Sequence, residues 1–434
     1  MSVLVVGVSH HSAPVAVLER LALDAEGAQK LVAEVSNAEH VTEATVIATC
    51  NRLEIYTEVE RFHGSIETIS RLLIERGGAT TEAMLPHLYV HYDDAAVSHL
   101  FRVAAGLDSM VVGEGQILGQ AREALRLGQE LGTVGPALNV LFQQALRVGK
   151  RAHAETDIDR AAPSLVTAAL ELAAPQVGGL AGRRAVVVGA GAMASLATAT
   201  LARAGVAELV VVNRTEPNAS RLAGEYGARA AQLPDLEREL VGADVVVSCT
   251  GSTGTVLTRD LVERARSGHD DPARPLAVVD LALPHDVEPG VGDLPGVLLL
   301  GLARLADELR IAEVAPGIDA VREIVTQEIA AFTSARRQAS VTPTVVALRT
   351  MATTVVESEM ARLDGRLPHL DPAARAEVLQ TVRRVADKLL HQPTVRVKQL
   401  ANEQGAVSYA AALAELFALD PDAVDAVTRP GGRP

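Results

Sequence analysis

The feature that most constrains the fold of this 434-residue chain is a glycine-rich segment directly after the apolar run Ala185 to Val188. The segment is Gly189-Ala190-Gly191-Ala192-Met193-Ala194, and a helical pattern follows it. The first glycine permits a tight turn, the second lets the backbone approach a pyrophosphate, and the last position needs only a small residue. The succession of strand, loop and helix therefore predicts a Rossmann-type dinucleotide-binding domain.

The residues after the next expected strand indicate which dinucleotide binds. The run Glu208 to Val212 is followed by Asn213, Arg214 and Thr215. NAD sites usually carry an acidic residue there, which holds the ribose 2′-hydroxyl. A guanidinium can instead pair with a 2′-phosphate and stack on adenine, whereas a carboxylate would repel that phosphate. The sequence therefore favours NADPH as the cofactor.

The remaining patterning divides the chain into further parts, because 434 residues are too many for one ordinary core. Runs at 245–247 and 277–281 have the spacing of parallel strands joined by crossover helices. The N-terminal part mixes strands and helices. Its expected strands are residues 3–8, 46–48 and 53–59, and its expected helices start near Val15, cover 95–130 with breaks at Gly106 and 113–115, and cover 137–152. Residues 318–434 show only helical periodicity, with breaks expected near Pro343, Pro368 and Pro393.

Composition restricts the class of protein. Hydrophobic residues make up 48% and charged residues 22%, which is typical of a soluble globular chain. Two cysteines cannot form a disulfide framework, so a reduced, cytoplasmic protein is expected. The apolar run Val3 to Val8 has no basic residue before it and is too short for a signal sequence. With no uninterrupted apolar run of about 18 residues, no membrane span is expected.

The net charge of −14 argues against general affinity for nucleic acid. An RNA partner would therefore have to meet a local basic surface. Residues 331–400 carry an excess of arginine and lysine over acidic residues. Charge alone favours a solvated helical surface as the explanation of this excess.

Cys50 is the candidate nucleophile. It ends an apolar run and is followed by Asn51 and Arg52, and an adjacent arginine lowers the pKa of a thiol. A buried structural cysteine is the other interpretation. Cys249, which has no basic neighbour in sequence, is expected to be structural. A reactive thiol and NADPH in one chain indicate that an acyl group is captured as a thioester and reduced to an aldehyde. The residues alone do not identify the acyl donor.

Further motifs occur in order along the chain. They are Gly7-Val8-Ser9-His10 with Ala13-Pro14, Thr49-Cys50-Asn51-Arg52-Leu53-Glu54-Ile55-Tyr56, the block from His99 through Ser109 to Gln120, Gly149-Lys150-Arg151, Glu155-Thr156 and Asp280-Leu281-Ala282-Leu283-Pro284. With the Rossmann turn and Asn213-Arg214-Thr215, they resemble the motifs of glutamyl-tRNA reductases over nearly the whole chain. Two positions depart from the family: Gly115 stands where proline is usual, which would loosen the loop, and His11 stands where lysine is common.

The resemblance implies a two-step reaction. Cys50 would attack the ester that links glutamate to tRNA(Glu), releasing the tRNA and leaving a thioester that NADPH reduces to glutamate-1-semialdehyde. This is the first committed step of five-carbon tetrapyrrole biosynthesis, the route to porphyrins and haem. His99 would be a second catalytic residue. The implied substrate-binding residues are Thr49, Cys50, Asn51, Arg52, Ser109, Glu114, Gly115, Gln116 and Gln120. The cofactor-binding residues would be Gly189, Ala190, Gly191, Ala192, Met193, Ala194, Asn213, Arg214 and Thr215.

The resemblance also implies an α/β multidomain architecture. Residues 1–160 would form a mixed α/β catalytic domain that binds glutamyl-tRNA(Glu), residues 161–310 a Rossmann-type NADPH-binding domain, and residues 311–434 an all-helical dimerisation domain. The apolar positions of the tail agree with a homodimer, since a single tail cannot bury them all. The family implies a further partner, the aminomutase that consumes the aldehyde.

The chemistry of the implied residues agrees with these roles. Arg52 has the planar fork that suits the side-chain carboxylate of glutamate, and glutamine would leave that fork unpaired. Glu114 could pair with the substrate ammonium. The neutral side chains Ser109, Gln116 and Gln120 supply hydrogen bonds.

Three alternatives compete with this interpretation. A thiol-dependent, NADP-linked acyl reductase or aldehyde dehydrogenase acting on a small molecule would need no helical tail. A catalytically silent tRNA- or NADP-binding regulator would have lost Cys50 or Arg52, and both are present. An enzyme like shikimate dehydrogenase would share the Rossmann half but would use a Lys–Asp pair in place of Cys50.

Overall fold

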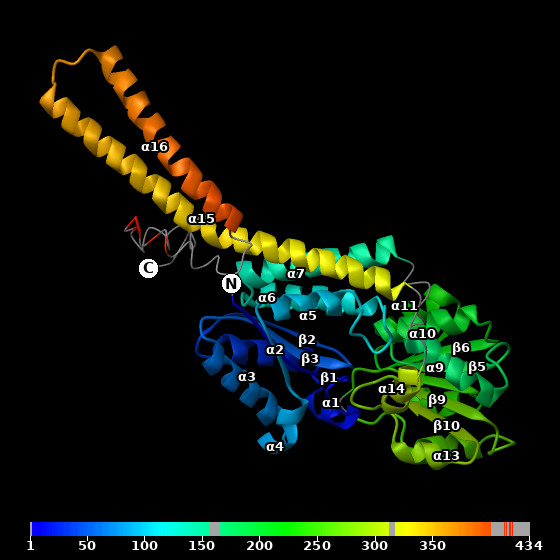
Figure 1. Cartoon of the computed structure of the whole chain (residues 1–434). Coiled ribbons are helices and arrows are strands. Elements are labelled where there is room, and N and C mark those ends of the chain that lie inside the picture. The colour runs from blue at the N-terminus through cyan, green and yellow to red at the C-terminus, as the bar shows by residue number, and fades with distance from the viewer. Residues whose placement is uncertain are drawn as a thin grey trace. The chain divides into compact units, whose positions relative to one another are not determined.

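The computed structural model describes residues 2–156, 165–252, 254–311 and 317–400, together with residues 412, 414, 416, 417 and 419. The chain divides into two compact units, Met1–Thr326 and Gln327–Pro434. The first unit contains two β-sheets, and the described part of the second is helical (Figure 1). The expected domain boundary between residues 160 and 161 lies outside the described residues.

The first sheet is a four-stranded antiparallel sheet with the strand order β2-β3-β1-β4. Its strands are β1 (Val3–Ser9), β2 (Val41–Ala48), β3 (Arg52–Val59) and β4 (Tyr89–Tyr92). The three strands expected here are confirmed, but β2 begins earlier than expected and β4 was not predicted. The start of β2 was missed because polar residues, among them the buried Glu43, interrupt its apolar pattern.

Helices cover both faces of this sheet (Figure 1). They are α1 (Val15–Leu21), α2 (Ala25–Ser36), α3 (Phe62–Arg76), α4 (Thr81–Met84), α5 (Asp94–Ala104), α6 (Gln116–Leu131) and α7 (Pro136–Glu155), with a 3-10 helix at Leu85–His87. One face shares a buried core with α1, α2 and α3. The expected breaks between α5 and α6 are confirmed. Gly106 and Gly113 in this segment adopt positive φ angles of 74° and 91°, a conformation that residues with a side chain rarely adopt.

A buried carboxylate joins the first sheet to α7. Glu43 in β2 is 5% exposed, and its two oxygens accept hydrogen bonds from the backbone N–H groups of Ala137 (2.9 Å) and Leu138 (2.7 Å). The first N–H groups of a helix have no partner within the helix, and a negative charge near them is favourable. Glu43 therefore caps α7 from a strand distant in the sequence.

The second sheet is parallel and six-stranded, with the order β10-β9-β8-β5-β6-β7. Its strands are β5 (Arg184–Val188), β6 (Glu208–Asn213), β7 (Arg229–Gln232), β8 (Val245–Ser248), β9 (Leu276–Asp280) and β10 (Val297–Gly301). This is the doubly wound order of a Rossmann fold, and the direction of winding reverses between β5 and β8. The predicted dinucleotide-binding fold is confirmed.

Helices pack on both faces of the parallel sheet. They are α9 (Leu165–Ala173), α10 (Ala192–Arg203), α11 (Glu216–Tyr226), α12 (Leu236–Leu240), α13 (Arg259–Ser267) and α14 (Leu302–Ile311), with 3-10 helices at Ala174–Val177, Leu233–Asp235 and Pro289–Asp293. Successive residues of a strand belong to the hydrophobic cores on the two opposite faces of the sheet. Val187 packs with α9 and α10, whereas Val186 packs with α12 and α13. Both faces are buried, as is usual for a parallel sheet.

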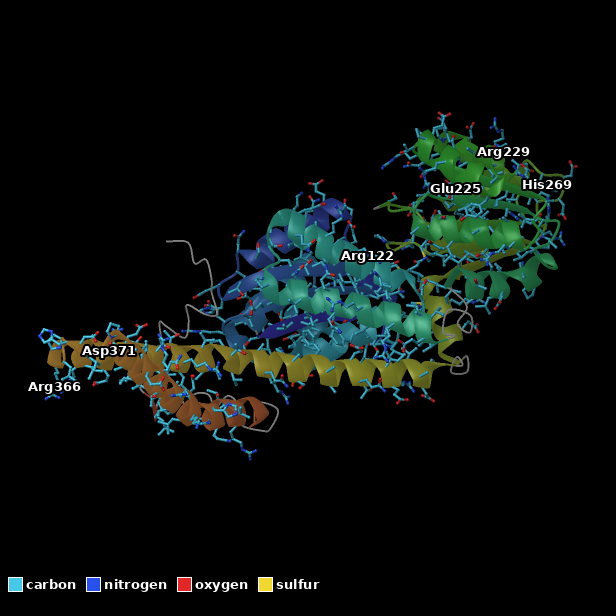
Figure 2. All side chains as sticks on the ribbon, turned by 90° about the horizontal axis from the view of Figure 1, so that it is seen from above. Arg122, Glu225, Arg229, His269, Arg366 and Asp371 are labelled. Carbon is cyan, nitrogen blue, oxygen red and sulfur yellow. The ribbon has the colours of Figure 1, made fainter. Side chains whose placement is uncertain are left out.

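The tail contains two long helices, α15 (Ile318–Arg366) and α16 (Pro372–Leu400). Arg366 and Asp371 mark the turn between them, where the break near Pro368 was expected (Figure 2). The breaks expected near Pro343 and Pro393 were wrong, because the helices continue through both prolines.

The physical reason is that a proline removes only one backbone hydrogen bond, and a long helix keeps those on either side. Neighbouring hydroxyls also bond to carbonyl oxygens one turn back. Thr342 donates to the oxygen of Gln338 (3.2 Å), and Thr394 donates to that of Leu390 (2.8 Å).

Ion pairs occupy part of the arginine excess in the tail. Arg375 pairs with Asp364 at 2.6 Å, and Arg384 pairs with Glu377 at 3.0 Å. This pairing agrees with the interpretation of the excess as a solvated helical surface. Among the described residues, α15 is also long and apolar enough to cross a membrane. Core helices of soluble proteins pass the same test, so the expectation of no membrane span stays a prediction.

The Glu43 cap makes a testable contribution to stability. Glu43→Ala should lower the free energy of unfolding by about 1–3 kcal/mol, because two buried N–H groups lose their acceptor. Glu43→Gln, which keeps one amide oxygen, should lose less. The exposed Glu60→Ala is the control. Thermal and urea unfolding of the purified chains measure the effect, and equal stability of Glu43→Ala and the control would contradict it.

Candidate active site

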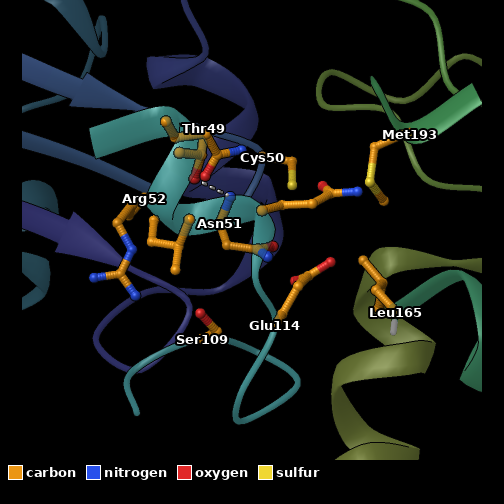
Figure 3. Close-up of a pocket in the computed structure, with 11 residues that line it drawn as sticks. Thr49, Cys50, Asn51, Arg52, Ser109, Glu114, Leu165 and Met193 are labelled. Atoms are coloured by element: carbon orange, nitrogen blue, oxygen red, sulfur yellow. Dashed lines mark hydrogen bonds between the residues drawn. The ribbon is translucent and has the colours of Figure 1, made fainter. Parts of the chain in front are cut away.

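Cys50 lies in the short turn that joins β2 to β3. The turn is held by a hydrogen bond from the N–H of Thr49 to the carbonyl of Arg52 (2.9 Å) and by one from the N–H of Asn51 to the Thr49 hydroxyl (3.1 Å). Cys50 is partly buried and lines a cavity of about 20 Å³ (Figure 3). The cavity is lined by Thr49, Cys50, Asn51, Arg52, Ser109, Glu114, Gln116, Ile117, Gln120, Leu165 and Met193.

The structure brings the expected substrate-binding residues together around Cys50, with the exception of Gly115. Sequence analysis did not place Ile117, Leu165 or Met193 here. Leu165 comes from α9 and Met193 from α10, so the Rossmann part of the first unit closes one side of the cavity. Their apolar side chains carry no chemical signal, and only the packing of the two parts assigns them to the cavity.

Gly115 stands at the N-cap of α6 with a φ of −70°. This is an ordinary helical conformation and lies within the range that proline allows. The expected loosening of the loop by glycine is therefore not visible in its backbone angles. A proline at this position would adopt the same φ.

The electrostatics of Cys50 differ from the expectation. Burial, and then the negative charge of Glu114, raise the pKa of the Cys50 thiol to about 12, and the opposing effect of Arg52 is smaller. Arg52 lowers the pKa of the thiol in the expected direction, but burial and Glu114 raise it by more, so Arg52 does not hold Cys50 as a thiolate. The guanidinium points away from Cys50 (Figure 3), where its Nη1 binds Glu54 at 2.8 Å and its Nη2 donates to the carbonyl of Asp108.

Glu54 is the centre of a buried polar network that sequence analysis missed. The side chain is fully buried, and its carboxylate binds Arg52 Nη1 (2.8 Å), Tyr56 Oη (2.6 Å), Tyr89 Oη (2.5 Å) and His99 Nε2 (2.8 Å). Burial alone would raise the pKa of Glu54, but Arg52 and His99 outweigh it and hold the pKa well below its usual range. A visible signal was the spacing of Arg52, Glu54 and Tyr56, which places them on one face of a strand.

Gly7 makes room for this network. It is paired with Glu54 on β3 and with Tyr89 on β4. A Cβ atom at Gly7 would lie 2.8 Å from Glu54 Cγ and 3.0 Å from the Tyr89 ring. The central strand therefore needs glycine at this point, because any side chain would displace the two groups.

The structure does not bring His99 into the Cys50 cavity. Its Nε2 is bound to Glu54, and its ring stacks on His91 with centroids 4.3 Å apart and an angle of 22°. His99 lines a neighbouring, open cavity of about 490 Å³, and Arg52 lines both cavities. His99 is therefore connected to the Cys50 site through Glu54 and Arg52.

A second candidate site lies at the carboxyl ends of β5, β6 and β8, the switch point of the parallel sheet. The pocket has a volume of about 370 Å³. It is lined by Val188, Gly189, Ala190, Gly191, Val212, Asn213, Arg214, Thr215, Asn218, Leu233, Cys249, Thr250, Gly251, Ser252 and Val256. Of the predicted cofactor residues, Ala192, Met193 and Ala194 do not line it. Ala194 lies on the buried face of α10, and Met193 lines the Cys50 cavity instead.

The backbone of this pocket fits a dinucleotide pyrophosphate. Gly189 has a φ of +123°, and a Cβ atom there would lie 2.7 Å from the carbonyl oxygen of Cys249. A Cβ atom at Gly191 would meet no heavy atom within 4 Å, so its backbone is open to a ligand. Among the described residues, no side chain caps the N-terminus of α10, which leaves the first-turn N–H groups available to a phosphate.

Sequence analysis missed the loop after β8. Thr250, Gly251 and Ser252 line the pocket, and Asp286 holds the loop by accepting hydrogen bonds from Ser248 Oγ (2.8 Å) and from the N–H of Thr250 (2.7 Å). The small polar residues directly after an apolar strand were the available signal. Cys249 is buried, as expected of a structural cysteine, and its burial raises the pKa of its thiol.

These two sites define the class of the protein. A thiol cavity in an antiparallel α/β domain stands beside a Rossmann pocket in one chain, which is the layout of a dinucleotide-dependent enzyme with a thiol nucleophile. Family models match three successive segments. The model for the N-terminal domain of glutamyl-tRNAGlu reductase matches residues 6–156, that for shikimate/quinate 5-dehydrogenase matches 171–307, and that for the glutamyl-tRNAGlu reductase dimerisation domain matches 320–419.

Whole-chain relatives agree with these matches. The chain is 71% identical to glutamyl-tRNA reductase 1 of a Nocardioides species, over the full length of both. It is 51% identical to glutamyl-tRNA reductase of Kineococcus radiotolerans, covering 100% of this chain and 96% of the relative. The solved glutamyl-tRNA reductase of Methanopyrus kandleri is 28% identical, with 96% and 99% of the two chains covered and a TM-score of 0.45. The chain belongs to the glutamyl-tRNA reductase family.

The buried network makes a prediction about stability and pH. Glu54→Gln should lower the free energy of unfolding at pH 7 by about 3 kcal/mol, because Arg52 loses the charge that compensates its burial. A carboxylate whose pKa is lower in the folded than in the unfolded chain stabilises the fold at pH values above the unfolded-state pKa. The loss of stability in Glu54→Gln should therefore be complete above about pH 5 and become smaller as the pH falls further. Denaturant unfolding across this pH range measures it, with Glu60→Gln as the exposed control. A deficit that is constant down to pH 3 would contradict the argument.

Proposed function

We propose that this chain reduces the glutamyl group of glutamyl-tRNA(Glu) to glutamate-1-semialdehyde with NADPH and releases the tRNA. This reaction is the first committed step of five-carbon tetrapyrrole biosynthesis. The observation that carries the proposal is the position of Cys50 in a cavity lined by polar side chains suited to an amino acid, in a chain that belongs to the glutamyl-tRNA reductase family over its full length.

We assign the steps to three parts of the chain. Residues 1–160 bind the glutamyl end of the tRNA and carry the thiol, residues 161–310 bind NADPH, and residues 311–434 dimerise. The matched segments 6–156, 171–307 and 320–419 support this division. The antiparallel sheet, the parallel sheet and the helical tail support it as well.

Cys50 is the nucleophile in this proposal. Its Sγ attacks the ester carbonyl carbon, a carbon–sulfur bond forms, and the bond from that carbon to the ribose oxygen breaks. Thr49 fixes the turn that presents Cys50. Asn51, Gln116 and Gln120 place neutral hydrogen-bonding groups around the reacting carbon, where such groups stabilise a developing oxyanion.

Arg52 is the residue that selects glutamate. It lines the Cys50 cavity, and its guanidinium is held in position by hydrogen bonds to Glu54 and to the carbonyl of Asp108. A buried guanidinium favours the side-chain carboxylate of glutamate over the neutral amide of glutamine. Ser109 adds a hydroxyl to the same wall, and Gly115 begins the helix that places Gln116.

His99 is a positioning residue in this scheme. It contacts Glu54, which in turn binds Arg52, and it does not line the cavity of the nucleophile. Loss of His99 would therefore act on the reaction through the orientation of Arg52.

NADPH, when bound, supplies the hydride that reduces the thioester to the aldehyde. Gly189, Ala190 and Gly191 would hold its pyrophosphate at the N-terminus of α10. Asn213 and Thr215 line the pocket at the end of β6, where the adenosine ribose lies in a Rossmann site. Arg214 is exposed at the same edge, and the described residues include no ion pair with it, so it is available to a 2′-phosphate.

The small-molecule alternatives are not favoured. Relatives that are similar over the whole chain are glutamyl-tRNA reductases, and the helical tail matches a dimerisation model. A silent regulator would not need Cys50 in a cavity with Arg52 and Glu114. The match of the shikimate dehydrogenase model covers only the Rossmann part, 171–307.

The tail indicates the assembly. The chain carries the family's dimerisation domain, and we propose a homodimer through residues 311–434. Val355 on α15 and Val385 and Leu389 on α16 are more than half exposed, and a dimer would bury such apolar side chains. We further propose a cytoplasmic location, in keeping with two free cysteines. The reactive aldehyde product makes the aminomutase that consumes it a natural partner.

The first test concerns the thiol. Wild type incubated with glutamyl-tRNA but no NADPH should slowly release free glutamate by thioester hydrolysis, and NADPH should divert the intermediate to the aldehyde. Cys50→Ser should lose both products, because both form through the thioester. Cys249→Ser is the matched control and should keep the NADPH-independent ester cleavage, since its thiol lies outside the Cys50 cavity. Product analysis with radiolabelled glutamate measures this, and equal losses in the two variants would refute a single nucleophile.

The second test concerns cofactor selectivity. Arg214→Ala should weaken NADPH binding by about 1.5–3 kcal/mol, the contribution of a charged hydrogen bond, and change NADH binding little. Titration of nicotinamide fluorescence measures both affinities. Arg221→Ala removes another exposed arginine of the same domain and serves as the control. If Arg214→Ala weakens NADH and NADPH equally, Arg214 is a structural residue.

A further inference from the structure

Glu114 is a partly buried carboxylate that the fold itself does not explain. It lies in the loop between α5 and α6, and its Oε1 atom is buried with no hydrogen-bond partner among the residues that the structure describes. A buried polar atom left unpaired costs about 1–3 kcal/mol, so such an atom in a native fold calls for an explanation. Glu114 lines the same cavity as Cys50, on the opposite side from the turn that carries the thiol (Figure 3).

The Cys50 thiol needs a proton acceptor. Burial raises the pKa of the Cys50 thiol to about 12, so the thiol is protonated at neutral pH and its proton has to leave as the sulfur attacks. Arg52 cannot accept it, and its terminal nitrogens are bound to Glu54 and Asp108. His99 lines the other cavity, with its Nε2 on Glu54.

The lining of the cavity leaves one candidate. Its charged or titratable side chains, among the residues that the structure describes, are Cys50, Arg52 and Glu114. The hydroxyl and amide side chains of Thr49, Asn51, Ser109, Gln116 and Gln120 do not take up a proton at neutral pH.

We propose that Glu114 is the proton-transfer residue of ester cleavage in the reaction put forward above. Its carboxylate takes the proton from Cys50 as Sγ bonds to the ester carbonyl carbon. It then gives that proton to the ribose oxygen of the terminal nucleotide as the carbon–oxygen bond breaks. The thioester, the free ribose hydroxyl and the regenerated carboxylate balance the step, and no further reactant is required. This inference rests on the proposed substrate.

The environment of Glu114 suits this task. Burial raises the pKa of Glu114 to about 7, and no neighbouring charge opposes that effect strongly. A general base is most effective when its pKa lies near the working pH, because it is then both ionised and basic enough to take a proton. Below pH 7 the carboxylate becomes protonated and can no longer accept the thiol proton, so ester cleavage should slow as the pH falls.

The competing role for Glu114 is to bind the substrate ammonium. The two roles differ in what they change. An ammonium partner contributes to affinity and leaves the chemical step largely unchanged once substrate is bound. A proton-transfer residue contributes to the rate of the bound complex and adds an ionisation to its pH profile.

The test is single-turnover cleavage of glutamyl-tRNA by excess enzyme without NADPH, over pH 5.5–9. For Glu114→Gln, we expect the maximal cleavage rate to fall by about 10²–10³-fold, the usual contribution of a general acid–base group. The enzyme concentration for half-maximal rate should change less than about threefold, and the acidic limb near pH 7 should disappear. Glu114→Asp, which keeps a carboxylate on a shorter side chain, should recover part of the rate and the limb.

The matched control is Glu67→Gln, which removes an exposed carboxylate on α3. Glu67→Gln should behave as wild type. A Glu114→Gln variant with a normal maximal rate and weakened binding would overturn the inference in favour of the ammonium role. So would an unchanged acidic limb. Melting curves identify a variant that fails to fold, in which case Glu114→Asp decides by its own rate and pH profile. If wild type itself cleaves no glutamyl-tRNA, the proposed function fails, which is a different result.

Discussion

The Arg52–Glu54 ion pair is the interaction on which the arrangement of the catalytic domain depends. Both side chains are almost completely buried, and an isolated charge in that environment would be very costly. The pair is tolerated because two tyrosine hydroxyls and an imidazole also form hydrogen bonds with Glu54. In addition, a backbone carbonyl accepts a hydrogen bond from the second terminal nitrogen of Arg52. β1, β3, β4 and α5 all contribute to these hydrogen bonds or make room for them. The absence of a side chain at Gly7 is part of the same arrangement.

The network separates charge from the nucleophile. Arg52 follows Cys50 by two residues and begins β3, but its guanidinium is directed toward Glu54, on the side away from the thiol (Figure 3). Arg52 lines the Cys50 cavity together with neutral polar side chains and the carboxylate of Glu114, and burial and Glu114 keep the thiol protonated at rest. Such a thiol is less exposed to chance oxidation or alkylation than a free thiolate, because the thiolate is the reactive form. In the proposed reaction, the attack by Cys50 then depends on a group that accepts the thiol proton once the substrate is bound.

The two sheets divide the remaining work according to their topologies. The antiparallel sheet offers a tight turn between β2 and β3 and buries a polar network on one face. The parallel sheet ends its central strands at one edge, where glycines and a free helix N-terminus form a site for phosphate. Met193 belongs to the glycine-rich turn of the second site but lines the cavity of the first. The segment that carries the dinucleotide fingerprint therefore also contributes to the wall around Cys50.

The sequence alone determined those features that depend on local patterns. The Rossmann turn, the strands around it, the breaks between α5 and α6 and the polar residues of the Cys50 cavity followed from short-range periodicity, glycine chemistry and family motifs. Local pattern failed at Pro343 and Pro393, because a long helix tolerates the loss of single hydrogen bonds that a short one does not. It also failed for β4, whose four residues are too few to show a period.

Only the tertiary structure decided the direction of the charged side chains. Nearness in sequence suggested that Arg52 activates Cys50. Arg52 and Glu54, however, lie two residues apart on β3 and point to the same face, where the carboxylate of Glu54 binds the guanidinium. The partners of His99, the burial of Glu114 and the membership of Leu165 in the cavity come from segments far apart in the chain. A pKa is set by the solvent and charges that surround a group in space. For that reason the motif around Cys50 predicted a nucleophile, whereas the protonation state of its thiol followed from the packed fold.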